Sequence, residues 1–267
     1  MSDRGKTEHS GPPLILLRGV SKSFANGIDA IARLDLEVRH GEFLSLLGPS
    51  GCGKSTALRI IAGLTEPSTG EIEWHGAAPA SAGETRIGFV FQEPTLMPWA
   101  NIFDNVMLPL RLKRIPRTRA ADRVNVALDR VGLQKFGGAY PRELSGGMRM
   151  RVSIARALIT EPTLLLMDEP FAALDEITRF KLNNDLLELW QSLHTTVMFV
   201  THSVFESVYL SSRIVVMTPR PGRVMTELAI DAPYPRDRNF RTSAEYAALC
   251  RRTSEALEQA MQAGTAQ

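Results

Sequence analysis

The stretch "GPSGCGKST", residues 48–56, carries the clearest chemical signal in this chain. It matches the pattern G-x-x-x-x-G-K-[S/T], and it lies between an apolar run that favours a strand and a segment that favours a helix. Glycines let successive backbone N–H groups turn toward phosphate oxygens, and the helix N-terminus adds positive potential. We therefore expect a triphosphate site here. The residues expected to bind ATP are Gly48, Pro49, Ser50, Gly51, Cys52, Gly53, Lys54, Ser55 and Thr56.

Two side chains of this loop have distinct expected roles. Lys54 would bridge the β- and γ-phosphates, and the Ser55 hydroxyl would ligate Mg²⁺. Cys52 lies between the glycines, close to Lys54 and a helix start, which favours a reactive thiolate. On that hypothesis a thiol alkylator would inactivate the protein and bound ATP would protect it; the alternative is that Cys52 only fills space.

An acidic pair follows a second apolar run in "TLLLMDEP". A nucleotide site of this type needs a carboxylate at the end of a neighbouring strand to hold Mg²⁺ through water, and Asp168 is in that position. Glu169 follows, with its side chain expected on the opposite side of the strand end, where it could act as general base toward water. A solvated turn is the alternative interpretation of an Asp-Glu pair.

Two more polar residues follow apolar runs in the same manner. His202 comes after residues 196–200, and Gln92 comes after residues 87–91. Ligands of open α/β sheets collect where parallel strands end. His202 could donate to the γ-phosphate, and Gln92 could contact Mg²⁺ or the attacking water. A plain surface position is the alternative for the histidine.

A second glycine-rich helix start occurs in "PRELSGGMRMRVSIARAL", residues 141–158. It has the look of an anion-binding helix N-terminus followed by a basic, amphipathic helix. It lacks the lysine and the Mg²⁺-binding hydroxyl of the first site, so it is a poor nucleotide site by itself. The sequence thus raises the question of why one chain carries both.

Short apolar runs that favour strands alternate with longer helical patterns. That order predicts an α/β fold with a mostly parallel sheet covered on both faces. A helical block at about residues 93–158 interrupts the rhythm and is interpreted as an inserted subdomain. The expected strands are residues 14–20, 34–38, 42–47, 71–74, 87–91, 163–167, 196–200, 214–217 and 223–228. The expected helices are residues 55–64, 102–112, 118–131, 148–159, 178–193 and 204–210, with a further helix in the C-terminal tail.

Composition excludes several classes of protein. The chain has 267 residues, 44% of them hydrophobic, and a formal net charge of +2, which is too balanced to argue for nucleic acid as the main partner. Two cysteines are too few for a disulfide framework or a zinc cluster. We expect no secretory signal peptide, and no stretch approaches the apolar length of a membrane span.

The order of these motifs resembles the nucleotide-binding subunit of an ABC transporter. The resemblance covers roughly residues 14–225 and rests on six features in order: residues 48–56, Gln92, residues 144–148, residues 164–169, "AALD" at 172–175, and His202. It implies a P-loop NTPase (ABC ATPase) core with an inserted helical subdomain and an N-terminal antiparallel β portion. The polar residues 1–12 are expected to be a disordered N-terminus, and the apolar spacing of residues 231–267 favours a C-terminal helical tail. The resemblance makes residues 13–230 the ATPase domain.

The same resemblance assigns further roles. It implies a homodimer in which ATP lies between two head-to-tail subunits, and Ser145 and Gly147 contact the γ-phosphate held by the other protomer. Asp175 would couple the two sites. Phe24 would stack on adenine, although a phenylalanine just after a strand can also be a core residue. The implied signature residues are Leu144, Ser145, Gly146, Gly147 and Met148. The family usually has Gln at the fifth position, where this chain has Met148, which carries no side-chain amide.

A finer resemblance follows Gln92. "FQEPTLMPWANIFDNVMLPL", together with "LSGGMR", is similar to importers of the nitrate, sulfonate and taurine group. It implies a peripheral subunit on the cytoplasmic face of the inner membrane, working with a separate integral-membrane permease and, indirectly, an extracytoplasmic solute-binding protein. Met97, Pro98 and Trp99 would suit contact with the permease; core packing is the alternative. ATPases of DNA repair or chromosome organisation are the alternative class, but they carry long coiled coils that this chain lacks.

Overall fold

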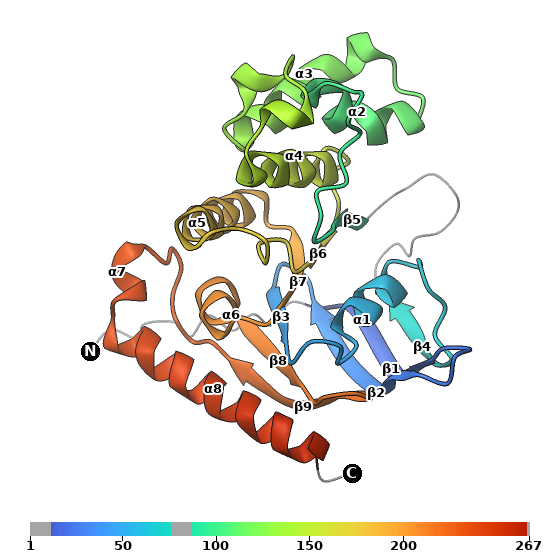
Figure 1. Cartoon of the computed structure of the whole chain (residues 1–267), viewed down its shortest axis with the longest axis vertical. Coiled ribbons are helices and arrows are strands. Elements are labelled where there is room, and N and C mark those ends of the chain that lie inside the picture. Colours follow the sequence, from blue (N-terminus) through green and yellow to red (C-terminus); the bar gives the residue numbers. More distant parts are fainter. Residues whose placement is uncertain (1–11, 76–86, 266–267) are drawn as a thin grey trace. The chain divides into compact units, whose positions relative to one another are not determined.

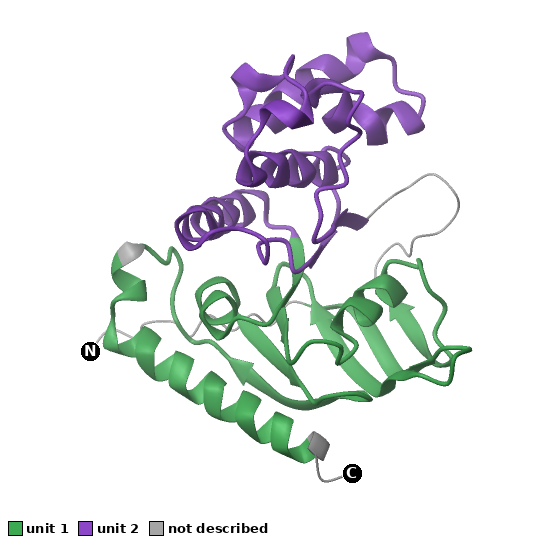
Figure 2. Ribbon diagram, viewed as in Figure 1, with its two compact units in different colours: residues 1–78, 196–267 green, residues 79–195 purple. Residues whose placement is uncertain are grey.

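The computed structural model describes residues 12–75 and 87–265, which form two compact units (Figures 1 and 2). Unit 1 comprises residues up to 78 together with residues 196–267, and unit 2 comprises residues 79–195. The expected disordered segment at residues 1–12 lies outside the described residues except for Pro12.

Unit 1 is built on a mixed sheet with the strand order β4-β1-β2-β9-β8-β3-β7. Its strands are β1 (Pro13–Ser23), β2 (Asp29–Arg39), β3 (Phe43–Leu47), β4 (Thr69–Trp74), β7 (Thr196–Thr201), β8 (Arg213–Met217) and β9 (Gly222–Ala229). β3 pairs in parallel with both β7 and β8, while β1 pairs antiparallel with β2 and β4. The N-terminal strands thus form the antiparallel β portion that the resemblance implied, and the parallel pairing expected from the alternation of strands and helices holds for β3, β7 and β8.

The core of unit 1 lies where the parallel strands meet. Every residue of β3 and of β7 is buried, and the rings of Phe43 and Phe199 lie 6.0 Å apart between centroids. Such unbroken apolar strands are typical of a sheet covered on both faces. β2 instead alternates buried and exposed residues, as a strand with one solvated face does.

The helices of unit 1 are α1 (Lys54–Ile61), α6 (Val204–Leu210), α7 (Arg238–Arg241) and α8 (Ala244–Thr265). α8 packs against α6, β8 and β9, and Figure 1 shows it running along that side of the sheet. Its buried face includes Tyr246, Cys250 and Ala260. α7 is a single turn with Asp237 as its N-cap, and none of the expected helices corresponds to it.

Unit 2 combines helices with a short parallel pair of strands, β5 (Ile87–Val90) and β6 (Leu164–Asp168). Its helices are α2 (Ile102–Leu112), α3 (Arg117–Arg130), α4 (Gly146–Leu158) and α5 (Glu176–Leu193), with short 3₁₀ turns at Gln134–Phe136 and Pro141–Glu143. α2, α3 and α4 pack on one another. The boundaries follow local capping: Asn101, Ser145 and Asp175 each accept a backbone N–H as N-cap of the next helix.

Candidate functional site

The glycine-rich loop of unit 1 curls around the ammonium group of Lys54. This side chain is only 4% exposed, and its Nζ donates to the carbonyl oxygens of Gly48 at 2.8 Å and Pro49 at 2.9 Å. The backbone N–H of Cys52 also points at the Pro49 oxygen, at 3.4 Å. A buried cation and a backbone donor thus converge on one oxygen, which is the arrangement that an anionic ligand requires.

Glycine is necessary at the end of this loop. Gly53 is the N-cap of α1 with φ of 98°, and a Cβ there would lie 2.6 Å from the Ala30 carbonyl oxygen. A side chain would therefore be strained and would clash with backbone. α1 also has no acidic residue in its first turn, so nothing on the helix itself competes for an anion at its start.

Cys52 is not the reactive thiolate that its neighbours suggested. It is 1% exposed, and burial raises the pKa of its thiol even though the Lys54 ammonium, with Nζ 3.8 Å from Sγ, acts to lower it. The expectation of a reactive thiolate took account of the positive charge of Lys54, but the burial of Cys52 cannot be deduced from its sequence neighbours. Desolvation disfavours the charged form of any acid, and here it outweighs the single lysine.

Phe24 and His202 also belong to unit 1. Phe24 follows β1 and is 42% exposed, with Lys22 Nζ 5.3 Å from its ring centroid, so it is no core residue. His202 directly follows β7 and is exposed. The turn that contains His202 is stabilised by the hydroxyl of Thr201. Thr201 Oγ1 donates to the buried Glu206 and accepts the N–H of Ser203.

The acidic pair lies at the end of β6 in unit 2. Asp168 is the last residue of this fully buried strand. Glu169 is half-buried and has φ of 45°, a left-handed conformation that costs a non-glycine residue about 1–3 kcal/mol and is concentrated at functional sites. Strand alternation therefore cannot place the Glu169 side chain, because the backbone has left the extended conformation at this residue.

The second glycine-rich helix start packs directly on the turn that holds Asp175. Ser145 is the exposed N-cap of α4, and its Oγ accepts the Met148 N–H at 3.3 Å. A Cβ on Gly147 would lie 2.7 Å from Thr178 Cγ2. Asp175 caps α5 by accepting the Thr178 N–H at 2.9 Å. Hydrogen bonds from the backbone and the side chain of Thr178 lower the pKa of the Asp175 carboxyl. Unit 2 therefore brings Ser145, Gly147 and Asp175 into one local structure.

Gln92 is exposed and lies two residues beyond β5, which ends at Val90, one residue earlier than expected. The segment after it is held by two side chains that the sequence analysis missed. Arg156 donates to the carbonyl oxygens of Pro94 and Thr95 at 2.8 and 2.9 Å. Asn105, fully buried, accepts the Met97 N–H and donates to three carbonyl oxygens between residues 97 and 101. A polar residue at a core-facing position of a helix was the available signal for Asn105.

The segment held by Arg156 and Asn105 leaves Trp99 on the surface. The side chain is 77% exposed, so core packing is not its role. Pro98 is exposed as well, and Met97 is half-buried. An exposed tryptophan on a loop that is tied down by buried polar groups suits contact with another protein.

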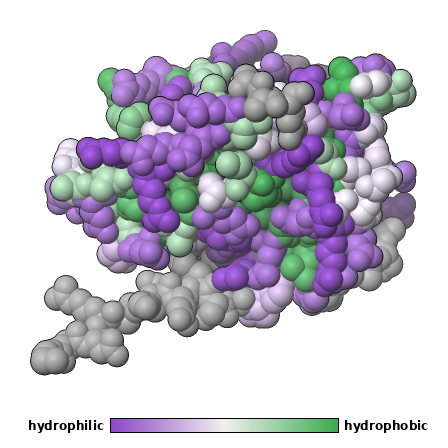
Figure 3. Space-filling view, turned by 90° about the horizontal axis from the view of Figure 1, so that it is seen from below, coloured by the Kyte–Doolittle hydropathy of each residue, from purple (hydrophilic) through white to green (hydrophobic). Residues whose placement is uncertain are grey.

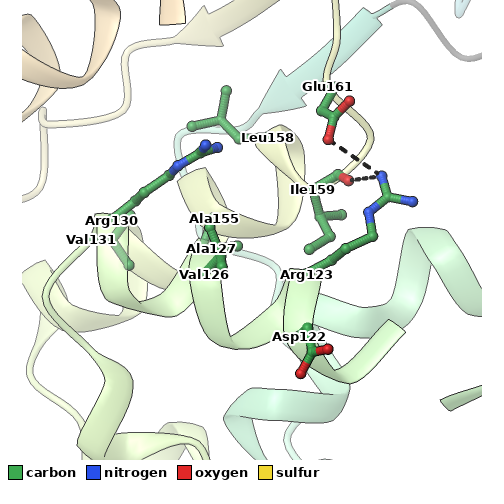
Figure 4. Close-up of a pocket in the computed structure, with 10 residues that line it drawn as sticks. All are labelled: Asp122, Arg123, Val126, Ala127, Arg130, Val131, Ala155, Leu158, Ile159 and Glu161. Atoms are coloured by element: carbon green, nitrogen blue, oxygen red, sulfur yellow. Dashed lines mark hydrogen bonds and ion pairs between the residues drawn. The ribbon is translucent and has the colours of Figure 1, made fainter. Parts of the chain in front are cut away.

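A pocket of about 200 Å³ in unit 2 lies elsewhere, between α3 and the end of α4 (Figure 4). Arg123 crosses its rim, donating to the Ile159 carbonyl oxygen at 2.9 Å and pairing with Glu161 at 3.8 Å. None of the residues expected to bind nucleotide lines it. Within the described ranges, no group of three or more His, Cys, Asp and Glu side chains forms a metal site.

Comparison with known proteins decides the family. The model of the ABC transporter family matches residues 31–172. An ABC transporter ATP-binding protein of Methanocaldococcus jannaschii is 50% identical over 221 residues, 83% of this chain and 82% of that protein. The chain belongs to the ABC transporter family of ATP-binding proteins. It is therefore an ATPase, and the predicted family and fold class are confirmed.

Solved structures of ABC ATPases are similar to the structure of this chain. A dimeric ATP-binding cassette in a post-hydrolysis state with ADP and Pi has a TM-score of 0.71 and 33% identity, covering 81% of this chain and 98% of that one. The cbiO1 protein of Clostridium perfringens, part of an ABC transporter complex, has a TM-score of 0.73 and 26% identity, covering 82% and 89%. The aliphatic sulfonates import ATP-binding protein of Bacillus subtilis is 42% identical over 228 residues, 85% of this chain and 87% of that protein.

Proposed function

We propose that this ABC ATPase powers the import of a small solute of the nitrate, sulfonate or taurine kind through a separate membrane permease. The observation that carries the proposal is the 42% identity to the aliphatic sulfonates import ATP-binding protein of Bacillus subtilis over 85% of the chain. A second import protein of the same name, from Bacillus cereus, is 40% identical over 234 residues. The stretch after Gln92, which resembles this importer group, supports the same class.

We further propose that ATP binds at residues 48–56. Lys54 would hold the β- and γ-phosphates, and Phe24, with its exposed ring, would stack on adenine. Lys54 Nζ and the Cys52 N–H are both donors directed into the loop, which supports phosphate binding by these groups. Mg²⁺ would be held by Ser55, Gln92 and, through water, Asp168; these hard oxygen donors suit the ion, which neutralises phosphate charge when bound.

Hydrolysis needs a base and a hydrogen-bond donor. Glu169 would take a proton from water while that water attacks the γ-phosphorus; the bond to the β–γ bridging oxygen breaks, giving ADP and phosphate. His202 would donate to the γ-phosphoryl oxygens. The left-handed backbone at Glu169 supports this role, because such strain persists where the surroundings fix a functional group.

Two subunits would form the working ATPase. Residues 144–148 of one subunit would close over ATP bound to the other, with Ser145 and Gly147 as phosphate contacts and Asp175 coupling the two sites. The dimeric cassette that this chain resembles supports such a pairing. The packing of Gly147 on Thr178, next to the Asp175 cap, gives that coupling a local structural basis.

The remaining partners would be an integral-membrane permease and an extracytoplasmic solute-binding protein, with the ATPase on the cytoplasmic face of the membrane. In the described part of the chain, every helix is too short or too polar to cross a bilayer. On the face seen in Figure 3, hydrophobic residues form small areas between hydrophilic ones. We propose the segment with Trp99 as the permease contact.

The substitution Glu169→Gln tests the catalytic assignment. It removes the base and keeps the shape, so we expect ATP turnover to fall by at least about 100-fold while ATP-bound dimers accumulate in size-exclusion chromatography. Normal turnover together with a monomer in ATP would show that the base is elsewhere.

Uptake measurements test the transport assignment. We expect deletion of the gene to abolish uptake of one of three labelled solutes, namely nitrate, an alkanesulfonate or taurine. Wild-type protein would restore that uptake, and the Lys54→Ala variant would not. Unchanged uptake of all three solutes would overturn the proposed substrate class.

A further inference from the structure

The turn between β8 and β9 forms a closed structure against the nucleotide loop of unit 1. Thr218 N–H donates to the Arg223 carbonyl oxygen at 3.0 Å, and Arg223 N–H donates back to Thr218 Oγ1 at 3.1 Å. A Cβ on Gly222 would lie 1.9 Å from the Cys52 carbonyl oxygen, so the two backbones are in direct contact. The two ends of the turn are therefore bonded to each other, and Gly222 lies directly against the Cys52 carbonyl group.

Arg220 lies on this turn and reaches the middle of the nucleotide loop. Its Nε donates to the Gly51 carbonyl oxygen at 3.2 Å. Its Nη2 would lie 2.9 Å from a Cβ at Gly51, where φ is +77°, so the absence of a side chain lets the guanidinium approach. The rest of the arginine is exposed, and the sequence analysis gave it no role.

The carbonyl that Arg220 holds belongs to the same peptide group as the Cys52 N–H. In a trans peptide the C=O and the N–H point in opposite directions. Arg220 therefore pulls the oxygen outward, while the N–H faces inward to the Pro49 oxygen on which Lys54 Nζ also converges. A positive charge on the carbonyl side also strengthens the N–H as a donor, because hydrogen bonds in a chain polarise one another.

We propose that Arg220 is a positioning residue for the nucleotide, acting through the Gly51–Cys52 peptide. It keeps that N–H turned toward the phosphate that residues 48–56 enclose, and this rests on the ATP site proposed above. Because the loop cradles the α- and β-phosphates, which ADP and ATP share, loss of Arg220 weakens both nucleotides equally. Arg220 does not reach the reacting atoms, so the rate at saturating ATP is preserved.

The test uses the purified full-length subunit and four variants: Arg220→Ala, Arg220→Lys, Arg223→Ala and Lys54→Ala. We expect Arg220→Ala to raise the Kd for ADP and for ATP, and the KM for ATP, by about tenfold, while kcat stays within about twofold. Arg220→Lys, which keeps a charged donor, restores most of the affinity. Arg223→Ala removes the same charge from the same hairpin but not the contact with Gly51, so it leaves both Kd values near those of the wild type.

Amide NMR gives a readout that a purely structural role would not move. The Cys52 N–H resonance should shift upfield in nucleotide-free Arg220→Ala and return in Arg220→Lys, while the melting temperature of both variants stays near that of the wild type.

Three results would separate the possible failures. Unchanged Kd values for Arg220→Ala, with nucleotide binding lost in Lys54→Ala, would overturn the role of Arg220 alone. Equal weakening by Arg220→Ala and Arg223→Ala would also overturn it, because net charge and not the peptide contact would then be responsible. Normal ATP binding by Lys54→Ala would instead overturn the proposed ATP site.

Discussion

Cys52 shows how burial and charge compete at a single residue. Its sequence neighbours are those of a low-pKa cysteine, with a lysine two positions away and a helix start next to it. In the folded protein, however, Cys52 is almost wholly buried, and a Cβ on Gly48 would lie 2.9 Å from its sulfur. The thiol therefore packs under the loop, and what Cys52 offers to the site is its backbone N–H.

The raised pKa of Cys52 predicts slow alkylation. A raised pKa leaves less thiolate at every pH below it, so the reaction of Cys52 with iodoacetamide should stay slow at neutral pH and reach half its limiting rate above pH 9.0, the ordinary pKa of the thiol. The measurement is a pH–rate profile on the Cys250→Ala variant, in which Cys52 is the remaining thiol. A half-maximal rate below that pH would show that Lys54 outweighs burial.

Arg220 and Asn105 show why the residue-level site was only partly predictable. The loop residues, Asp168 and His202 follow a recognisable local pattern of strand, polar residue and helix. Arg220 acts on a carbonyl 169 positions away in the sequence, and Asn105 is recognisable only once the apolar face of α2 is known to be buried. The local sequence pattern therefore predicts the reactive residues of a motif. It does not predict the residues that hold the motif in place, because their contacts become known only from the folded structure.

At the scale of elements, the junction of α4 and α5 is the tightest contact near the second glycine-rich helix start. Gly147 has an ordinary helical backbone, so alanine would be favoured there by helix propensity, by about 1 kcal/mol. The contact with Thr178 forbids it, because a Cβ would lie 2.7 Å from Thr178 Cγ2. The glycine is thus required by packing between helices and not by backbone conformation.

A double substitution tests this contact. We expect Gly147→Ala to destabilise the protein by about 1–3 kcal/mol through overpacking. Adding Thr178→Ser removes the methyl group and keeps the hydroxyl beside Asp175, so the free energy of unfolding should return to at least the wild-type value. Urea denaturation of both single variants and the double variant measures the effect. Equal losses in Gly147→Ala with and without Thr178→Ser would show that the clash is not the cause.

Element prediction succeeded where local signals were strong. The helix at residues 102–112 and the start of β7 at Thr196 occur where expected, because Asn101 is a good N-cap and β7 is an unbroken run of buried residues. α4 instead begins at Gly146, two residues before the expected start, because Ser145 caps it even though glycine has low helix propensity. The antiparallel pairing of β1 with β2 and β4 was implied by the family resemblance alone, because the direction of pairing depends on which segments meet in space.

At the scale of the whole molecule, the predicted site residues divide between the two units. Phe24, residues 48–56 and His202 belong to unit 1, whereas Gln92, residues 144–148, Asp168, Glu169 and Asp175 belong to unit 2. Each unit orders its own part locally, through the Lys54 contacts in one and the α4–α5 junction in the other.

The proposed in-trans role of Ser145 predicts a result that a single-chain site cannot give. Ser145→Arg should abolish ATP hydrolysis while ATP binding by the monomer stays near wild type, because the serine would act on nucleotide held by another subunit. Mixed with the equally inactive Lys54→Ala variant, it should recover activity, since each mixed dimer contains one site with both motifs intact. At equal amounts half of the dimers are mixed, so about a quarter of wild-type turnover is expected if the sites act independently. Loss of ATP binding by Ser145→Arg monomers would place Ser145 in the same site as the P-loop of its own chain.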